Sequence, residues 1–134
     1  FQNTLATFQL TGADIKQALE NGVSQVEEGA GRFPQVAGIQ FDWSRKGEAG
    51  VDRIKAVRVK NASNEWVPID MDATYTVVSN NFLRAGGDGY TVFTDKGRNA
   101  YDFGPNMEDA VVAYLQSDNE AYKPYTDGRI REVE

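Results

Sequence analysis

The residues best suited to chemistry gather in the stretch Gly86-Gly-Asp-Gly89, where three glycines surround one carboxylate. Glycine is favoured where φ must be positive or where another group approaches the backbone closely. An outward-facing carboxylate can accept hydrogen bonds from two adjacent hydroxyls, so Asp88 would suit paired hydroxyls such as a ribose diol. A tight loop without a ligand is the alternative interpretation. No Gly-Lys-Ser/Thr follows here or after Gly29-Ala-Gly31, so neither stretch is a Walker-type phosphate loop.

Other side chains could bind a ligand or an ion. Phe82, six residues before Asp88, could stack on a base or a sugar ring, although a loop aromatic more commonly fills the local core. The acidic pairs Asp70/Asp72 and Glu27/Glu28 could bind a hard cation. Because the EF-hand spacing is absent, a solvated turn is the simpler interpretation of Asp70 and Asp72.

The composition excludes several classes of chemistry. The 134-residue chain has no Cys and no His. Thiol catalysis and disulfides are therefore ruled out, and Ser-His-Asp or His-metal hydrolase sites cannot be assembled from this chain alone.

A net charge of −6 disfavours a nucleic-acid polymer or an anionic membrane surface as partner. No run of about 18 apolar residues is present, so no membrane span is predicted. Since the chain begins at Phe1 rather than Met, we expect an excised domain or a mature product.

Hydrophobic periodicity predicts the elements that position these residues. Thr11, with Asp14 three residues on, should cap a helix that runs to about Glu28. Asn106 should cap a second helix, and residues 80–90 are predicted to be a loop. A change of phase within residues 51–60 indicates either a bulge or burial of the strand on both faces. The buried stripe of the second helix should comprise Met107, Ala110, Val111, Tyr114 and Leu115. The predicted strands are Thr4–Leu10, Ala37–Trp43, Val51–Lys60, Trp66–Ile69, Thr74–Ser79 and Thr126–Val133.

This order of elements favours one fold class. Strands and helices do not alternate regularly, as they would in a doubly wound parallel sheet. The order predicts an α+β fold with a largely antiparallel or mixed sheet and two main helices. The length of the chain, together with the lack of any repeat or linker, predicts a single domain that spans residues 1–134.

The segment Asn80-Asn-Phe-Leu-Arg-Ala-Gly-Gly-Asp-Gly-Tyr90 resembles a motif of the C-terminal domain of the 5′-nucleotidase family. That motif has Asn-Phe-Leu, a short spacer, Gly-Gly-Asp-Gly and then an aromatic residue. The family includes periplasmic UDP-sugar hydrolase, animal ecto-5′-nucleotidase and the 2′,3′-cyclic nucleotide phosphodiesterases. The resemblance covers nearly the whole chain. The other stretches that resemble the family, in the same order, are Phe1–Gly12, Gly31–Gly38, Asp42–Gly47 and Asp127–Ile130.

The resemblance implies a substrate site and a division of labour. The implied substrate-binding residues are Phe1 and Phe82 on either side of the base, Asn3 and Gly31 beside it, and Asp88 at the ribose hydroxyls. No catalytic or metal-binding residue is implied in this chain. Two divalent metal ions and a catalytic His-Asp pair would belong to an N-terminal metallophosphoesterase domain of the same polypeptide, and the phosphate-binding arginines would lie upstream of Phe1.

The implied function is that of the nucleoside- or nucleotide-binding domain of an exported, metal-dependent nucleotide phosphohydrolase, periplasmic or extracellular. The full-length protein would be an enzyme, whereas this chain alone would be inactive. Its expected partners are the nucleotide substrate and the N-terminal domain. A non-enzymatic nucleotide-binding or protein-interaction module of the same fold is the alternative. A self-standing hydrolase that uses Asp70, Asp72 or Asp88 is a third possibility, but it lacks a nucleophile paired with a base.

Overall fold

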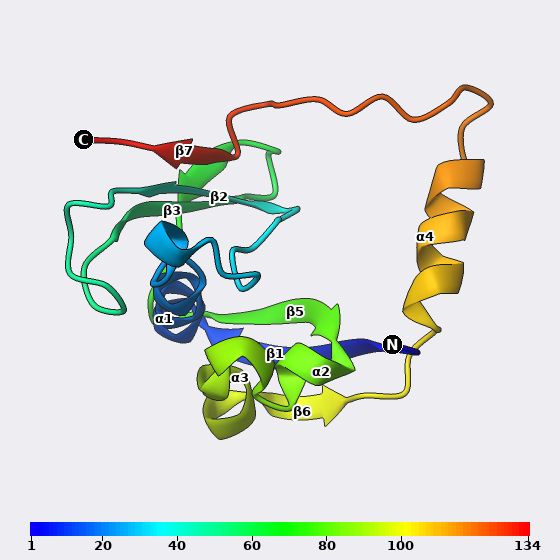
Figure 1. Ribbon diagram of the computed structural model, residues 1–134, viewed down its shortest axis with the longest axis horizontal. Coiled ribbons are helices and arrows are strands. Elements are labelled where there is room, and N and C mark those ends of the chain that lie inside the picture. The colour runs from blue at the N-terminus through cyan, green and yellow to red at the C-terminus, as the bar shows by residue number, and fades with distance from the viewer.

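Two separate β-sheets form the framework of the computed structural model, which describes residues 1–134 (Figure 1). In the first sheet, β1 (Leu5–Thr11) lies between β5 (Thr74–Asn80) and β6 (Arg98–Tyr101), with both pairings antiparallel. The second sheet has the order β4-β3-β2-β7, and only β7 runs parallel to its neighbour. Its strands are β4 (Trp66–Pro68), β3 (Ile54–Lys60), β2 (Ile39–Trp43) and β7 (Ile130–Glu132). The predicted α+β class is confirmed, and the strands divide between two sheets.

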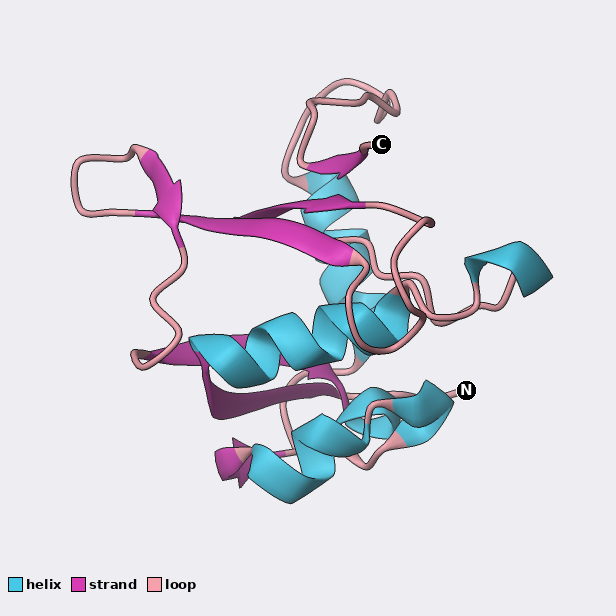
Figure 2. Ribbon diagram, turned by 90° about the vertical axis from the view of Figure 1, so that its left-hand side faces the viewer, coloured by secondary structure: helices cyan, strands magenta, loops and turns pink.

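Helix α1 (Gly12–Gly22) lies between the two sheets and contributes to a core on each side (Figures 1 and 2). Ala18 packs in one core with Phe8 of β1, whereas Leu19 packs in the other with Phe41 of β2. All four side chains are buried. Because it is buried on two sides, α1 holds one sheet in a defined position relative to the other.

The predicted cap of this helix is confirmed, but its predicted end is wrong. The Thr11 hydroxyl accepts a hydrogen bond from the Asp14 N–H at 3.2 Å. The helix ends at Gly22, where a Cβ atom would lie 2.7 Å from the Pro34 ring. A turn then leads into the 3-10 helix η1 (Val26–Glu28). The apolar spacing continues through this turn, and for that reason periodicity conceals the break.

A buried carboxylate connects α1 to the second sheet. Glu20 accepts hydrogen bonds from the backbone N–H groups of Arg53 at 2.9 Å and Ile54 at 3.0 Å, and from the Lys16 ammonium group at 3.2 Å. A buried charge is tolerated when it is paired and hydrogen-bonded in this way. The contact fixes the start of β3 against the helix.

The predicted bulge lies in the hairpin formed by β2 and β3. Asp42 is opposite Ala56, whereas the next residue, Trp43, is opposite Ile54. Lys55 is therefore the extra residue in β3, which explains the change of phase in the sequence.

The segment after β5 is more regular than predicted. Residues 80–90 contain a short helix, α2 (Asn81–Arg84), and the 3-10 helix η2 (Gly87–Gly89), so the prediction of a loop is wrong. The Asn80 side chain caps α2 by accepting a hydrogen bond from the Leu83 N–H at 2.8 Å. Helix α3 (Thr91–Lys96) and strand β6 follow, and neither is predicted. Each of these elements is too short to show a period in the sequence.

The second predicted helix is present, but its apolar stripe is not buried. Helix α4 (Met107–Gln116) begins after Asn106, whose side chain accepts a hydrogen bond from the Glu108 N–H at 2.9 Å. None of its residues is buried, and the helix stands apart from both sheets (Figure 1). The predicted burial is wrong because periodicity identifies an apolar face without showing what covers it. Neither α4 nor any other helix has the length and apolar character needed to cross a membrane.

Candidate functional site

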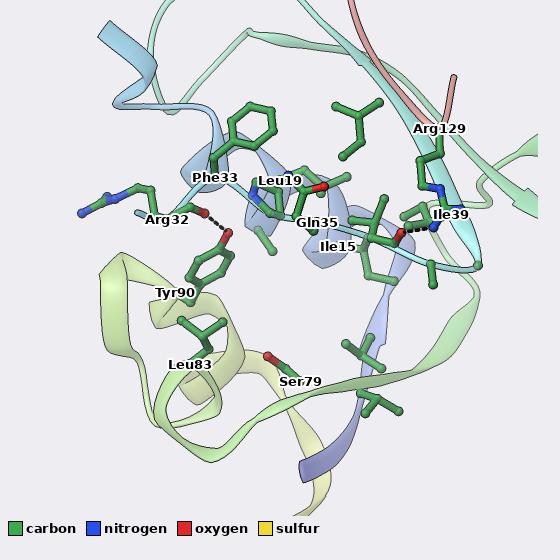
Figure 3. A pocket seen from close by; sticks show the side chains of 18 of the residues that line it. Ile15, Leu19, Arg32, Phe33, Gln35, Ile39, Ser79, Leu83, Tyr90 and Arg129 are labelled. Carbon is green, nitrogen blue, oxygen red and sulfur yellow. Dashed lines mark hydrogen bonds between the residues drawn. The ribbon is translucent and has the colours of Figure 1, made fainter. Parts of the chain in front are cut away.

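A large hollow opens between α1, the segment 31–39 and the β5 side of the first sheet (Figure 3). This main hollow has a volume of about 1300 Å³, and 20 of its 31 lining residues are hydrophobic. Gly31 and Asp88 both line it, together with Arg32 and Tyr90. The structure therefore brings two of the predicted site residues to one cavity from distant parts of the chain. We call the part formed by these four residues the polar rim.

Hydrogen bonds made by the Tyr90 and Asn21 side chains connect the two halves of the polar rim, which are Gly31 with Arg32 and Asp88 with Tyr90. The Tyr90 hydroxyl donates to the Arg32 carbonyl at 2.7 Å, drawn as a dashed line in Figure 3. Asn21, close to the end of α1, donates to the Asp88 carbonyl at 3.1 Å and accepts from the Arg32 guanidinium group at 3.0 Å. The backbone around Gly31 and the backbone around Asp88 are thus held at a defined spacing.

Tyr90 belongs to the rigid core beneath the polar rim. Its side chain is buried, and its ring stacks on Phe93 with 5.0 Å between centroids. Burial raises the pKa of Tyr90 to about 12, an effect that the positive charge of Arg32 opposes and the negative charge of Asp88 reinforces. The phenol is therefore neutral near pH 7 and remains a hydrogen-bond donor to Arg32.

Asp88 is exposed, and its backbone adopts a left-handed conformation with φ of 54°. Only glycine adopts this region at no steric cost, although Asp and Asn tolerate it better than most residues. Its carboxylate has no ion-pair partner. At Gly89, a Cβ atom would lie 2.6 Å from the Asn21 side-chain oxygen, so the close approach of α1 requires glycine there. Local strain at a residue with a free carboxylate is typical of functional positions.

Phe82 lies against the same glycine-rich stretch. A Cβ atom at Gly87 would come within 2.4 Å of its ring, so the ring rests directly on the glycine backbone. The side chain is 51% exposed, so about half of it faces solvent. An aromatic ring held in this way can stack on a planar group. Phe82 is not part of the lining of the main hollow and lies beside its polar rim.

The amino-terminal residues lie beside α2. Thr4 accepts a hydrogen bond from the Asn81 N–H and donates its own N–H to the Asn81 side chain, each at 3.0 Å. Phe1 is fully exposed, whereas Asn3 is half-buried. Neither residue lines the main hollow. The structure therefore brings Gly31 and Asp88 together, with Phe82 adjacent, and leaves Phe1 and Asn3 outside this cavity.

The acidic pairs form no metal site. Asp70 accepts a hydrogen bond from the Asp72 N–H at 2.9 Å within their turn. Glu27 accepts two hydrogen bonds from Arg53, at 2.7 and 3.1 Å, and these lower its pKa. No group of three or more His, Cys, Asp or Glu side chains is placed to hold a metal ion. The carboxylates of Asp70, Asp72, Glu27 and Glu28 are therefore engaged in turns and ion pairs or stand alone, and the hypothesis that these pairs bind a cation gains no support.

Asn21 is the residue of this site that sequence reasoning does not find. It lies within a helical pattern, and its partners Arg32 and Asp88 are 11 and 67 residues away along the chain. No local signal marks such a residue. Tyr90 is visible only as the aromatic residue that closes the glycine-rich motif, and the sequence does not indicate that it hydrogen-bonds to Arg32.

Comparison with known proteins agrees with this architecture. The family described as 5′-nucleotidase, C-terminal domain, matches residues 1–95. The trifunctional nucleotide phosphoesterase protein YfkN of Bacillus subtilis is 41% identical over 99% of this chain and 9% of its own length. Human 5′-nucleotidase is 32% identical over 98% of this chain and 23% of its own length. The crystal structure of the 5′-nucleotidase precursor from Thermus thermophilus superimposes with a TM-score of 0.90 at 40% identity, covering 98% of this chain and 25% of that one.

These matches have two consequences. The chain spans a quarter or less of each of these relatives, so it corresponds to one part of a larger protein in every case. The matched family model covers most of the chain, the relatives are similar in sequence over nearly all of it, and the Thermus structure has the same fold. This chain belongs to the family of 5′-nucleotidase C-terminal domains.

Proposed function

We propose that this chain is the substrate-binding domain of an exported nucleotide phosphohydrolase, and that the polar rim receives the nucleoside part of the substrate. The observation that carries the proposal is the joining of Gly31 and Asp88 at one cavity by Asn21 and Tyr90. A carboxylate without an ion-pair partner, beside exposed backbone and an aromatic ring, suits a sugar diol attached to a planar base.

The chemistry would take place elsewhere in the full-length protein. The chain has no His and no cluster of metal ligands, so hydrolysis requires groups that it does not contain. We infer that a metallophosphoesterase domain of the same polypeptide holds two divalent metals and receives the phosphate. Binding energy from the nucleoside part would then position the phosphate at the metals in the other domain. The proposal includes export to the periplasm or the cell exterior, and the family resemblance supports this part of it.

Asp88→Asn in the full-length protein tests the substrate role directly. Asn tolerates the left-handed backbone, so this change removes the charge without the strain that Ala would add. For a ribonucleoside 5′-monophosphate we expect kcat/KM to fall about 10- to 100-fold, the range of a charged hydrogen bond. For the 2′,3′-dideoxy analogue we expect a much smaller change, because that ligand has no hydroxyls for the carboxylate to bind.

The outcomes separate the competing functions. Equal losses for the two nucleotides would contradict the diol role and would indicate that Asp88 braces its own loop. Full-length protein that binds nucleotide in calorimetry but releases no phosphate with added divalent metal would indicate the non-enzymatic module. An upstream sequence without clustered Asp, His and Asn-His-Glu motifs would agree with that second result.

A further inference from the structure

Arg32 is a half-buried arginine without an ion-pair partner. Every other arginine except Arg98, which is exposed on β6, pairs with an Asp or Glu side chain. A guanidinium group has five N–H donors, and in Arg32 one of its nitrogens donates to the Asn21 side-chain oxygen at 3.0 Å. Its other donors have no acceptor in the protein. Because a charge that is partly removed from water needs a partner, this arrangement favours a role in binding a ligand.

The Arg32 guanidinium group lies next to Asp88. A Cβ atom at Gly89 would come within 2.8 Å of a guanidinium nitrogen, so this group rests on the Gly89 backbone. The Phe82 ring rests in the same way on Gly87. Gly87 and Gly89 flank Asp88, and its free carboxylate therefore has an aromatic ring and a cation as neighbours. Figure 3 shows the Arg32 side chain extending away from the apolar side chains of the main hollow.

The charges of Arg32 and Asp88 do not neutralise each other, although both residues line the polar rim. Asn21 holds them in this arrangement. Its side-chain oxygen accepts from the Arg32 guanidinium group, and its amide donates to the Asp88 carbonyl at 3.1 Å, which leaves the carboxylate free. A ligand that satisfies both charged groups must therefore offer hydrogen-bond donors to Asp88 and acceptors to Arg32.

A ribonucleoside can offer both kinds of group. Its diol supplies the donors, and the acceptors must then come from the base. The planar guanidinium group contacts two adjacent acceptors side by side. Among purines, guanine and hypoxanthine present O6 and N7 in this way, whereas adenine has an amino donor in place of O6. A phosphate would also accept from Arg32, but the Asp88 carboxylate beside it would repel a second anion.

We propose that Arg32 determines the base preference of this site by donating hydrogen bonds to O6 and N7 of a 6-oxopurine. The full-length protein would then prefer inosine and guanosine 5′-monophosphates to adenosine 5′-monophosphate. Adenine is disfavoured because its amino group would face a guanidinium group that has no acceptor. The inference rests on the proposed function, since it requires the nucleoside to lie at the polar rim. Arg32 binds the base and takes no part in hydrolysis.

The ratio of kcat/KM for inosine 5′-monophosphate to that for adenosine 5′-monophosphate tests this role in the full-length protein. The two nucleotides share the ribose and the phosphate. Both values come from one preparation, so the ratio does not depend on the fraction of folded protein. We expect a ratio of about 10 to 100, the range of a charged hydrogen bond. If the protein releases no phosphate, calorimetric affinities for the same two nucleotides give the same comparison.

Variants at position 32 should change this ratio in a defined order. Met has no donor, so Arg32→Met should lower the ratio at least about 5-fold. Arg32→Glu should make the adenine nucleotide the better substrate, because a carboxylate accepts from its amino group. Arg98→Met is the matched control. It also removes an arginine without an ion-pair partner, but from a position that does not line the main hollow, and the ratio should change less than about 2-fold.

Two results would overturn the inference on its own terms. One is an equal kcat/KM for the two nucleotides in the parent protein, or an unchanged ratio in Arg32→Met. The other is an equal change of the ratio in Arg32→Met and Arg98→Met, which would assign the effect to net charge.

The Asp88→Asn variant separates this inference from the proposed function. If its loss depends on the ribose hydroxyls while the ratio is insensitive to Arg32, the nucleoside binds at the polar rim and only the base contact is wrong. If the ratio depends on Arg32 while Asp88→Asn weakens the ribonucleotide and its dideoxy analogue equally, the base contact is supported and the diol role is contradicted. If neither dependence is found, both proposals fail.

Discussion

The side-chain amide of Asn21 donates a hydrogen bond to the backbone carbonyl of Asp88 at 3.1 Å, although 67 positions separate the two residues. The same amide accepts from the Arg32 guanidinium group at 3.0 Å. Asn21 thus connects the end of α1 to both halves of the polar rim. The carboxylate of Asp88 is free to contact a ligand because the backbone of that residue is held by another side chain.

Asn21→Asp should weaken substrate binding without stopping catalysis. The new carboxylate still accepts from Arg32, but it cannot donate to the Asp88 carbonyl and it adds a negative charge beside Asp88. In the full-length protein we expect KM for a ribonucleotide to rise roughly 3- to 10-fold, as for the loss of one hydrogen bond, with kcat changed less than about 2-fold. Steady-state kinetics measures both values. A fall in kcat with an unchanged KM would show that Asn21 does not act through the binding site.

Gly87→Ala should displace the Phe82 ring. The added Cβ would lie 2.4 Å from that ring, and φ at Gly87 is not positive, so the effect is steric rather than conformational. We expect weaker nucleotide binding and a changed environment for Phe82, seen as shifted aromatic proton resonances in NMR spectra of the full-length protein.

Gly31→Ala is the matched comparison for this steric effect. A Cβ atom at Gly31 meets nothing within 4 Å, so thermal stability should be unchanged. If a base lies beside Gly31, nucleotide binding should still weaken, because the methyl group would project into the site. Unchanged affinity in the Gly31→Ala variant would argue against a base at that position.

Tyr90→Phe should loosen the polar rim and lower stability modestly. The change removes the hydrogen bond to the Arg32 carbonyl, 2.7 Å long, while retaining the ring that stacks on Phe93. We expect a loss of about 0.5–1.5 kcal/mol in the free energy of unfolding, measured by denaturant titration. Because the pKa of Tyr90 is raised to about 12, this difference should be the same from pH 6 to pH 9. A difference that varied within this range would show that another group titrates with the hydroxyl.

Asp42 should make stability dependent on pH in acid. Its carboxylate bonds to Arg131 at 3.0 Å and to Arg58 at 2.8 and 3.3 Å, and these contacts lower its pKa below the ordinary value of 3.8. A pKa lowered by folding gives stability that is fully present above the unfolded value and lost as pH falls through the folded value. Asp42→Asn should therefore destabilise the protein at pH 7. The difference from the parent should shrink below about pH 4. A constant difference down to pH 2 would contradict this assignment.

The amino-acid sequence by itself determined the local structure where the pattern is long or the capping chemistry is strong. The β-branched and apolar residues of the predicted strand Thr4–Leu10 do form a strand, β1 (Leu5–Thr11). Thr11 and Asn106 mark helix starts, because their side chains satisfy backbone N–H groups in the first turn. The glycines around Asp88 likewise indicate a special backbone conformation, and Asp88 does have a positive φ. Each of these signals acts over a few residues.

Only the tertiary structure decided how these pieces meet. The division of the strands between two sheets, the contact of Asn21 with Asp88 and the joining of Gly31 to Tyr90 through Arg32 depend on groups far apart in the chain. The apolar stripe of α4 shows the limit most clearly, since its periodicity is that of a buried helix and its side chains are exposed. A helical period shows that a face is apolar. Burial depends on a second surface, and a local sequence pattern contains no information about that surface.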